Sequence, residues 1–269
     1  MAAPRSRPLR LLTIAGSDSG GGAGIQADLL TFAAHGAYGL SAVTAVTAQD
    51  TLAVHAVHPV PPEVVAAQID AAFGDIGVDG VKIGMLGSAA VATAVAERLA
   101  VHLAALAAWP PVVLDPVLAA TAGPPLLAGD ALPVLVGELV PLATVVTPNL
   151  PELARLTGLP AGDEEARVAA ARELVHRGPA VLATGGHGRG DEVVDLLVTA
   201  AAVYRFARPR LVSAAGHGTG CTLAAALAAR LAAGEPLPAA AEGAIDYVRG
   251  ALAAAPGLGR GRGPLGRPA

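Results

Sequence analysis

The sequence predicts a three-layer αβα fold, with a mostly parallel central sheet between two layers of helices. Short apolar runs that favour strands alternate with segments of helical periodicity along the chain, which is typical of successive βαβ units. The apolar runs 193–198 and 202–206 have no helix between them, so an antiparallel hairpin is expected at one side of the sheet. Hydrophobic residues make up 53% of the 269 residues, which is ample for the core of such a fold.

The predicted elements follow one another from residue 9 onward. The apolar run 9–14 predicts a buried strand, a glycine-rich turn ends it, and the Ala- and Leu-rich pattern 24–35 predicts the first helix. Further strands are expected at 41–46, 80–83, 112–114, 145–147, 180–183, 193–198 and 202–206. Further helices are expected at 62–73, 89–107, 132–139, 151–156, 164–177, 220–233 and 238–254. The last two strands, with no helix between them, are the expected hairpin.

The domain organisation follows from the absence of a linker. No polar or Pro/Ser-rich stretch divides the middle of the chain, so residues 1–256 are expected to form a single domain. Residues 257–269 are rich in Gly, Arg and Pro and predict a frayed tail.

Composition excludes several classes of function. The formal net charge of −4 gives no basic field for nucleic acid. The single cysteine excludes an internal disulfide and a cysteine zinc site, and it fits a reducing compartment. No run of about 18 apolar residues is free of charge and proline, so no membrane span is expected. The arginines near the N-terminus lack a following signal-peptide core, and a cytoplasmic protein is expected.

The turn after the first strand, AGSDSGGGAGIQADL at 15–29, is the most informative stretch. A strand that breaks into glycines before a helix can cradle a small polar group. Glycines alone would favour a plain strand–helix turn, but Asp18 and its neighbouring serines precede them and Asp28 follows in the helix. The spacing fits neither the dinucleotide fingerprint nor a P-loop.

A second constellation opens the predicted helix 220–233 with Gly218-Thr219-Gly220-Cys221. A helix N-terminus preceded by glycine presents unpaired N–H groups and the positive end of a dipole, which suits a phosphoryl group. In the first turn the pKa of the Cys221 thiol is expected to fall, so that a thiolate takes the proton of a substrate hydroxyl. The alternative is a small buried cysteine that only packs.

Carboxylates follow two of the predicted strands, Asp115 in Asp-Pro-Val and Glu152 in Asn-Leu-Pro-Glu. Magnesium prefers carboxylate oxygens and retained water, so the two could hold a hydrated Mg²⁺ ion, with Asn149 adding a contact to the metal or to phosphate. The alternative is a pair of acids at helix N-termini. Spacing alone does not decide between the two.

Eight short motifs together resemble the hydroxymethylpyrimidine and phosphomethylpyrimidine kinases of thiamine biosynthesis, in the ribokinase-like superfamily. They run in family order from about residue 12 to about residue 235. They are AGSDSGGGAGIQADL (15–29), GAYG (36–39), TAQDT (47–51), KIGML (82–86), LDPV (114–117), TPNLPE (147–152), GGH (185–187) and HGTGCT (217–222).

The resemblance implies a ribokinase-like fold and an ATP- and Mg²⁺-dependent kinase. Its substrates would be 4-amino-5-hydroxymethyl-2-methylpyrimidine and the monophosphate of that alcohol. A pyridoxal or pyridoxine kinase is the second enzymatic interpretation, and a weakened pyrimidine-binding module is the third. A homodimer is a further expectation, since relatives with this fold often dimerise.

The resemblance also implies roles for four groups of residues. One group is expected to bind ATP and another to bind Mg²⁺. The catalytic group would be Gly218, Thr219, Gly220 and Cys221. The pyrimidine would contact Ala23, Asp28, Gln49, Met85 and Val117. ATP would contact Asn149, Thr184, Gly186 and His217. The metal would bind Asp115 and Glu152.

The chain departs from the family pattern at three places near the expected nucleotide site: Thr184 stands for a lysine, Ala214-Ala215 stands for polar residues before Gly216-His217, and Ala122 stands for a serine. The family usually has Lys-Gly-Gly-His after the strand predicted at 180–183, whereas this chain has Thr184 in place of the lysine. Threonine keeps a hydroxyl but loses the positive charge, and charge-assisted hydrogen bonds are about twice as strong as neutral ones. Arg189 is a candidate to replace that charge.

Overall fold

The structure is a computed structural model that describes residues 7–119, 127–188, 190–213 and 215–266. Within these ranges a central sheet of nine strands runs in the order β3-β2-β1-β4-β5-β6-β7-β8-β9. The six strands β2, β1, β4, β5, β6 and β7 are parallel to one another. Strand β3 at one edge, and β8 and β9 at the other, are each antiparallel to a neighbour. The predicted mostly parallel sheet, with a hairpin at one side, is therefore confirmed.

The strands lie close to their predicted positions. Their bounds are β1 (Arg10–Asp18), β2 (Tyr38–Gln49), β3 (Val54–Pro59), β4 (Gly80–Ile83), β5 (Val112–Leu114), β6 (Val145–Val146), β7 (Ala180–Ala183), β8 (Glu192–Val198) and β9 (Val203–Pro209). The central strands β4 and β5 are buried along their whole length, since helices cover both faces of a parallel sheet.

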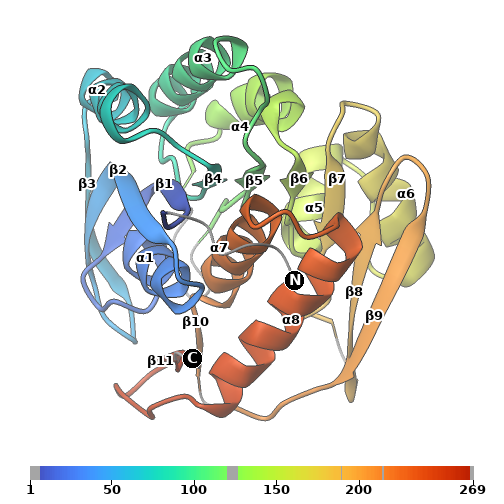
Figure 1. Ribbon diagram of the computed structural model, residues 1–269. Helices are drawn as coiled ribbons and strands as arrows, with labels where there is room; N and C mark the ends of the chain where they lie inside the picture. Colours follow the sequence, from blue (N-terminus) through green and yellow to red (C-terminus); the bar gives the residue numbers. More distant parts are fainter. Residues whose placement is uncertain (1–6, 120–126, 189, 214, 267–269) are drawn as a thin grey trace.

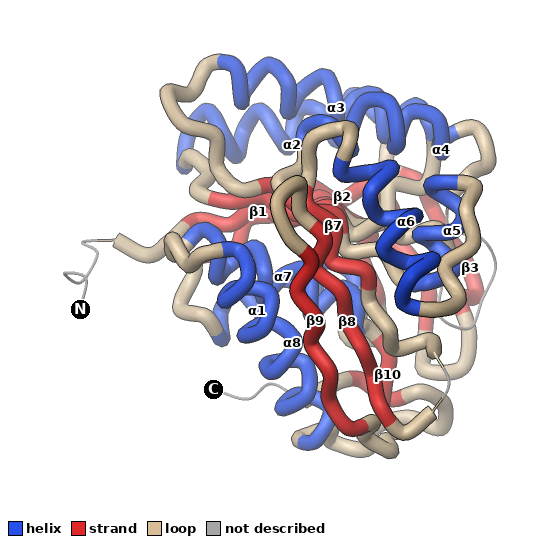
Figure 2. Tube along the Cα trace, turned by 90° about the vertical axis from the view of Figure 1, so that its right-hand side faces the viewer, coloured by secondary structure: helices blue, strands red, loops and turns tan. Residues whose placement is uncertain are grey.

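The helices divide between the two faces of the sheet (Figure 2). On one face lie α2 (Pro62–Ala71), α3 (Ala89–Ala104), α4 (Ala131–Val134), α5 (Leu150–Thr157) and α6 (Glu164–Val175). On the other face lie α1 (Gly24–Ala34), α7 (Thr219–Ala232) and α8 (Leu237–Ala253). The helical pattern predicted at 132–139 is a short α-helix continued by a wider π-helical turn, Leu135–Leu139.

Alternation along each strand divides the core into two parts. In β1, Leu12 and Ile14 belong to the cluster under α2 and α3, whereas Leu11 belongs to the cluster under α7 and α8. Helix α7 is rich in alanine and its middle is fully buried, so it packs closely against β4 and β5. This close packing holds the first turn of α7 against the ends of the central strands.

The sequence did not predict three short strands. Strand β3 is almost wholly exposed and therefore lacks the alternation of buried and exposed residues that signals a strand. Strands β10 (Ala215–His217) and β11 (Gly263–Pro264) form a separate two-stranded parallel sheet. Their glycines and proline carry no strand signal of their own.

The C-terminal segment differs from the frayed tail that the composition predicted. Residues 263 and 264 pair with β10, Leu265 is 3% exposed, and the N–H of Gly266 donates to the carbonyl of Ala251 at 2.9 Å. The glycines of this segment made its composition resemble that of a frayed tail, yet they also allow it to pack tightly. A Cβ at Gly266 would lie 2.2 Å from the carbonyl oxygen of Ala254. The segment up to residue 266 is thus part of the folded body.

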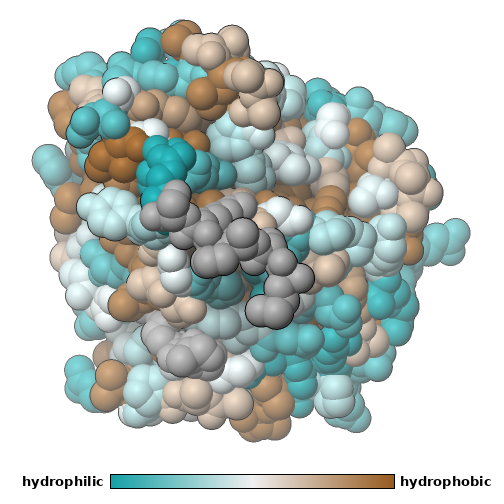
Figure 3. All heavy atoms as spheres, viewed as in Figure 1, coloured by the Kyte–Doolittle hydropathy of each residue, from teal (hydrophilic) through white to brown (hydrophobic). Residues whose placement is uncertain are grey.

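The described helices and one face of the surface (Figure 3) bear on whether the chain could span a membrane. On the face shown in Figure 3, hydrophilic and hydrophobic residues are interspersed. None of the helices in the described part of the chain combines the length and the hydropathy that crossing a bilayer requires.

Candidate active site

A cavity of about 850 Å³ lies at the carboxyl ends of the parallel strands, where open α/β sheets bind ligands. The segments at the ends of β1, β2, β4, β5, β6 and β7 line it, together with the first turn of α7. The predicted site residues that line it are Ala23, Gln49, Met85, Asp115, Val117, Asn149, Glu152, Thr184, Gly186, His217, Gly218, Thr219, Gly220 and Cys221. The structure therefore brings together every predicted site residue except Asp28.

Asp28 does not line the cavity, so the expected direct contact with a pyrimidine is wrong. Its carboxylate is fully buried, where it accepts hydrogen bonds from Thr13 Oγ1 at 2.6 Å and from Lys82 Nζ at 2.9 Å. The ammonium of Lys82 also lies 3.9 Å from Asp115 Oδ2. Burial by itself would lower the pKa of Lys82, but the nearby carboxylates raise it above its ordinary value. Lys82 thus stays charged and links Asp28, inside the fold, to Asp115, at the cavity.

The glycine-rich turn after β1 binds an anion, but that anion is the chain's own Asp18. The Asp18 carboxylate accepts hydrogen bonds from the N–H groups of Gly20, Gly22 and Ala23 at 2.8 to 3.0 Å, and it contacts His217 Nε2 at 2.8 Å. Burial alone would raise the pKa of Asp18, but these hydrogen bonds lower it below its ordinary value. The N–H groups of the turn are therefore already hydrogen-bonded to Asp18, and the turn fixes His217 beside the cavity.

The N-terminus of α7, where the sequence predicted an anion site, lies at the cavity behind a glycine. Gly218 precedes the helix with φ at +84°, a conformation that favours glycine, and a Cβ there would lie 1.9 Å from the Gly22 carbonyl oxygen. The carboxylate oxygens of Asp115 lie 3.7 Å from the place where a Cβ of Gly220 would stand. The first turn of α7 therefore meets Asp115 across a narrow gap.

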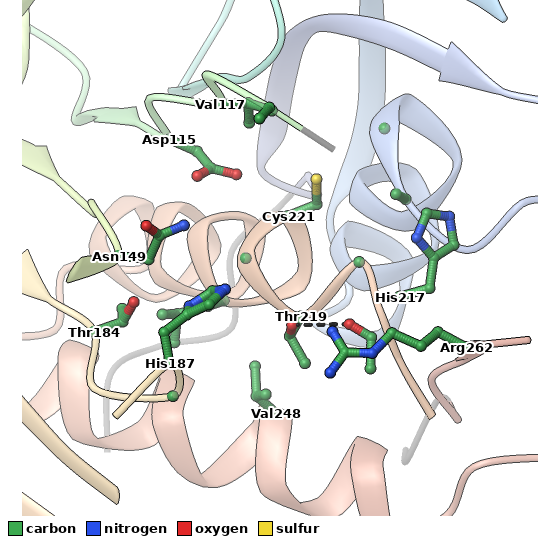
Figure 4. Close-up of a pocket in the computed structure, with 18 of the residues that line it drawn as sticks. Asp115, Val117, Asn149, Thr184, His187, His217, Thr219, Cys221, Val248 and Arg262 are labelled. Atoms are coloured by element: carbon green, nitrogen blue, oxygen red, sulfur yellow. Dashed lines mark hydrogen bonds between the residues drawn. The ribbon is translucent and has the colours of Figure 1, made fainter. Parts of the chain in front are cut away.

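Cys221 lies in that first turn, with its sulfur in the cavity near Asp115 (Figure 4). Burial raises the pKa of the Cys221 thiol to about 12. Lys82 opposes this rise, while Asp115 and Asp28 add to it. The predicted lowered pKa is thus wrong, because desolvation and like charges outweigh the helix N-terminus. A thiol with this pKa is protonated near neutral pH, and its sulfur lies beside the carboxylate of Asp115 (Figure 4).

Asp115 and Glu152 form a buried carboxylate pair. Desolvation raises the pKa of Asp115 to about 6, and desolvation together with Asp115 raises the pKa of Glu152 to about 8. Glu152 and Asn149 also form a reciprocal capping box at the start of α5, with hydrogen bonds of 2.9 and 3.0 Å. Both interpretations from the sequence are therefore compatible: Glu152 caps a helix and lines the cavity.

Asn149 and Thr184 stand side by side on the opposite side of the α7 N-terminus from His217 (Figure 4). The amide oxygen of Asn149 is used by the cap, which leaves its NH₂ group for the cavity. The Thr184 N–H donates to the carbonyl of Pro148 at 2.9 Å, so the threonine is held at the end of β7. Arg189, the candidate replacement for the missing lysine charge, lies outside the described residues, as do Ala122 and Ala214.

The predicted ring-binding residues surround the other part of the cavity. Gln49 Nε2 lies 3.2 Å from His217 Nε2, which places His217 next to Gln49 instead of next to Asn149. The carbonyl of Met85 accepts a hydrogen bond from Thr44 Oγ1 at 2.6 Å, which fixes the turn after β4. Val117 faces Cys221 from the turn after β5 (Figure 4).

Sequence reasoning missed several arginines of the cavity. Arg210 donates to the carbonyls of Gly186, Gly188 and Gly190 at 2.8 to 3.0 Å and so holds the loop after β7. Arg262 reaches the cavity from the C-terminal segment and points toward Thr219 (Figure 4). Their segments have no periodic pattern, so no sequence signal placed them here.

Comparison with known proteins agrees with this geometry. Residues 18–266 match the family model of phosphomethylpyrimidine kinase. A hydroxymethylpyrimidine/phosphomethylpyrimidine kinase of Rhizobium meliloti is 48% identical over 94% of this chain and 95% of its own length. The thiamine biosynthesis bifunctional protein ThiED of Geobacter sulfurreducens is 49% identical over 95% of the chain, which spans 51% of that relative. The ADP complex of Bacillus subtilis pyridoxal kinase superimposes with a TM-score of 0.88 at 32% identity, over 97% of this chain and 98% of that one.

Proposed function

Because the chain belongs to the phosphomethylpyrimidine kinase family, we propose that it phosphorylates 4-amino-5-hydroxymethyl-2-methylpyrimidine and then the resulting monophosphate with ATP. The observation that carries the proposal is the meeting of the glycine-capped N-terminus of α7 with Asp115, in the cavity that Gln49 also lines. An anion site and a ring-binding amide in one cavity are what a phosphoryl transfer to a small heterocyclic alcohol requires.

The N–H groups at the start of α7 bind the γ-phosphoryl group in this mechanism. They are fixed before substrate arrives, because Gly218 packs against Gly22 and the body of α7 is buried. Fixed dipoles stabilise charge as it develops without having to reorganise, which is the main contribution to catalysis in such sites. The hydroxymethyl oxygen then attacks the γ-phosphorus from the side of Gln49 and Met85. The bond from the γ-phosphorus to the bridging oxygen breaks, ADP leaves with that oxygen, and the hydroxyl proton passes to water.

The residues that hold the pyrimidine act by shape and by hydrogen bonding. The amide of Gln49 offers a donor and an acceptor to the aminopyrimidine edge, and Ala23, Met85 and Val117 contact the ring. Cys221 keeps its proton near neutral pH, and its thiol shapes the floor of the site beside Asp115 (Figure 4). Lys82 neutralises Asp28 and part of Asp115 from below.

Asp115 and Glu152 fit a magnesium site. Asp115 Oδ2 is buried, accepts no hydrogen bond within the part of the chain that the structure describes, and has Lys82 Nζ only at 3.9 Å, so it retains the capacity to bind a second cation. No group of three or more metal-binding side chains occurs among the described residues, but Mg²⁺ is commonly held by one or two carboxylates together with phosphate oxygens and water. When bound, the ion would neutralise negative charge on the phosphate chain.

A pyridoxal kinase is the second candidate function. The observation that favours it is the close superposition on Bacillus subtilis pyridoxal kinase. Identity over nearly the whole chain is 48% to the Rhizobium meliloti pyrimidine kinase and 32% to the Bacillus subtilis pyridoxal kinase, so the pyrimidine remains the preferred substrate.

A coupled assay of ADP release tests the proposal, with the pyrimidine alcohol, its monophosphate, pyridoxal and pyridoxine as separate acceptors. We expect Mg²⁺-dependent turnover with the two pyrimidines, at a higher kcat/KM than with either pyridine. A higher kcat/KM with pyridoxal would make the chain a pyridoxal kinase. Pyrimidine binding without any ADP release would instead indicate a binding module.

A further inference from the structure

The C-terminal segment delivers one arginine to the cavity. Strand β11 pairs with β10, so that Gly263 lies opposite Ala215 and Pro264 lies opposite His217. On the other side of Arg262, the N–H of Gly261 donates to Thr51 Oγ1 at 3.1 Å. The backbone of the segment is therefore anchored on both sides of this residue.

The glycines that flank Arg262 explain why its side chain points into the cavity. A Cβ at residue 261 would lie 2.0 Å from the carbonyl oxygen of Thr51, and a Cβ at residue 263 would lie 2.8 Å from that of Leu258. Glycine is thus required on the packed side at both positions. Arg262 lies between them, lines the cavity and extends toward Thr219 at the N-terminus of α7 (Figure 4).

Arg262 is not engaged elsewhere, unlike most other arginines of the cavity. Arg208 pairs with Glu242 and Asp246, Arg210 binds three carbonyls, and Arg249 donates to the carbonyl of Pro209. The described residues include no hydrogen-bond acceptor or acidic partner for the guanidinium of Arg262. Its positive charge is felt inside the cavity, since burial and then Arg262 lower the pKa of His187.

We propose that Arg262 binds phosphoryl oxygens at the N-terminus of α7 and supplies the cation that Thr184 does not provide. The inference rests on the proposed kinase function. A guanidinium presents N–H donors in a planar fork that matches two oxygens of one phosphate. The α7 N–H groups and Arg262 would then hold the same phosphoryl group from two directions.

Two phosphates could be the one bound, and both have the same chemistry. One is the terminal phosphate of ATP, which both phosphorylation steps use. The other is the phosphate of the pyrimidine monophosphate, which only the second step uses. If Arg262 binds the terminal phosphate of ATP, its loss would slow both phosphorylation steps. If it binds the phosphate of the pyrimidine monophosphate, its loss would slow only the phosphorylation of that monophosphate.

The kinetic test compares Arg262→Gln with Arg260→Gln, a matched control two residues away whose side chain does not line the cavity. We expect Arg262→Gln to lower kcat/KM by about 10- to 100-fold in one or both steps, since a hydrogen bond to a charged group is worth that much. Arg262→Lys should recover part of the loss, and Arg260→Gln should behave as wild type. Equal effects of Arg262→Gln and Arg260→Gln would overturn the proposal.

Thr184→Lys added to Arg262→Gln tests the division of labour directly. A lysine at the end of β7 restores a cation to the cavity, so the double variant should regain activity relative to Arg262→Gln.

Arg155 also lines the cavity and is the alternative cation. If Arg155→Gln lowers kcat/KM and Arg262→Gln does not, the phosphate is bound by Arg155 and the role of Arg262 is overturned.

Binding without turnover separates this inference from the proposed function. Calorimetry with a non-hydrolysable ATP analogue, the pyrimidine monophosphate and adenosine needs no catalysis. Arg262→Gln should weaken one phosphorylated ligand about 10- to 100-fold while adenosine binding and the thermal unfolding temperature stay unchanged. Equal weakening of all three ligands, or none, would show a structural role or no role and would overturn the inference. An inactive wild type that still shows the selective loss would refute only the proposed reaction.

Discussion

Cys221 shows how the surroundings of one residue can reverse a local expectation. Its position in the first turn of α7 predicts a lowered pKa, because a helix N-terminus favours the thiolate. The structure buries the thiol beside Asp115, and its pKa rises to about 12. The residues that reverse the shift lie far away in the sequence, so inspection of the helix start alone could not reveal them.

The Cys221→Ser variant distinguishes a neutral donor from a thiolate base. Serine keeps a small hydrogen-bond donor but cannot form an anion near neutral pH. Because the raised pKa keeps the thiol protonated near neutral pH, we expect Cys221→Ser to keep kcat within about tenfold of wild type, measured by ADP release. Removing a general base lowers the rate by about 10²–10⁴, so a loss of that size would show that substrate binding creates the thiolate after all.

Gln49 is expected to contribute to binding of the pyrimidine and not to binding of ATP. Leucine keeps most of its volume but cannot donate to or accept from the pyrimidine edge, and unpaired polar atoms then cost about 1–3 kcal/mol. Gln49→Leu should therefore raise the Kd for the pyrimidine about 5- to 100-fold and leave the Kd for an ATP analogue unchanged, both by calorimetry. Equal losses for both ligands would indicate damage to His217 and the turn that it holds.

At the scale of elements, the buried pair of Lys82 and Asp28 joins β4 to α1 beneath the site. Both side chains are fully buried and their charged atoms lie 2.9 Å apart. Lys82→Met leaves the buried carboxylate without its cation, which should lower the free energy of unfolding by about 3–5 kcal/mol in a denaturant titration. The double variant Lys82→Met/Asp28→Leu should be more stable than Lys82→Met. If the single variant is as stable as wild type, the pair contributes nothing to the fold.

The C-terminal segment offers a matched pair of leucines. Leu265 is 3% exposed and Leu258 is 60% exposed. Leu265→Ala should cost about 2–5 kcal/mol of unfolding free energy because it leaves a cavity, whereas Leu258→Ala should stay within about 0.5 kcal/mol. Similar small effects for both would return the segment to the frayed tail that composition suggested.

At the scale of the whole molecule, the sequence predicted the sheet better than the site. Alternating apolar runs and helical patterns are properties of contiguous residues, so the order of elements could be predicted from them. The exposed strand β3 and the pairing of β10 with β11 depend on contacts between distant segments and had no such signal. For the same reason the site was predicted where each strand ends, but the burial of Asp28 and the arrival of Arg262 were not. The assignment of residues 1–256 to one domain stays a prediction.

The linkage of Asp18 across the molecule predicts how stability depends on pH. Asp18 ties the turn after β1 to His217, which lies 199 positions further along the chain, and its pKa in the folded protein is lower than normal. Such a group stabilises the fold above its unfolded pKa of about 3.9, and that contribution is lost as the pH falls through the folded pKa. Asp18→Asn should therefore lower the free energy of unfolding by about 2–3 kcal/mol at pH 7, since its charged hydrogen bonds are lost.

The difference between wild type and Asp18→Asn should shrink steadily as the pH falls below about 4, because unfolded wild type then binds a proton at Asp18 that the folded protein binds only at lower pH. Denaturant titrations of both proteins between pH 7 and pH 3 measure this directly. Asp75 provides the control, since it is exposed and its carboxylate accepts no hydrogen bond from the described residues, so Asp75→Asn should follow wild type. A difference between Asp18→Asn and wild type that stays constant across this range would mean that Asp18 stabilises the turn by shape and not by charge.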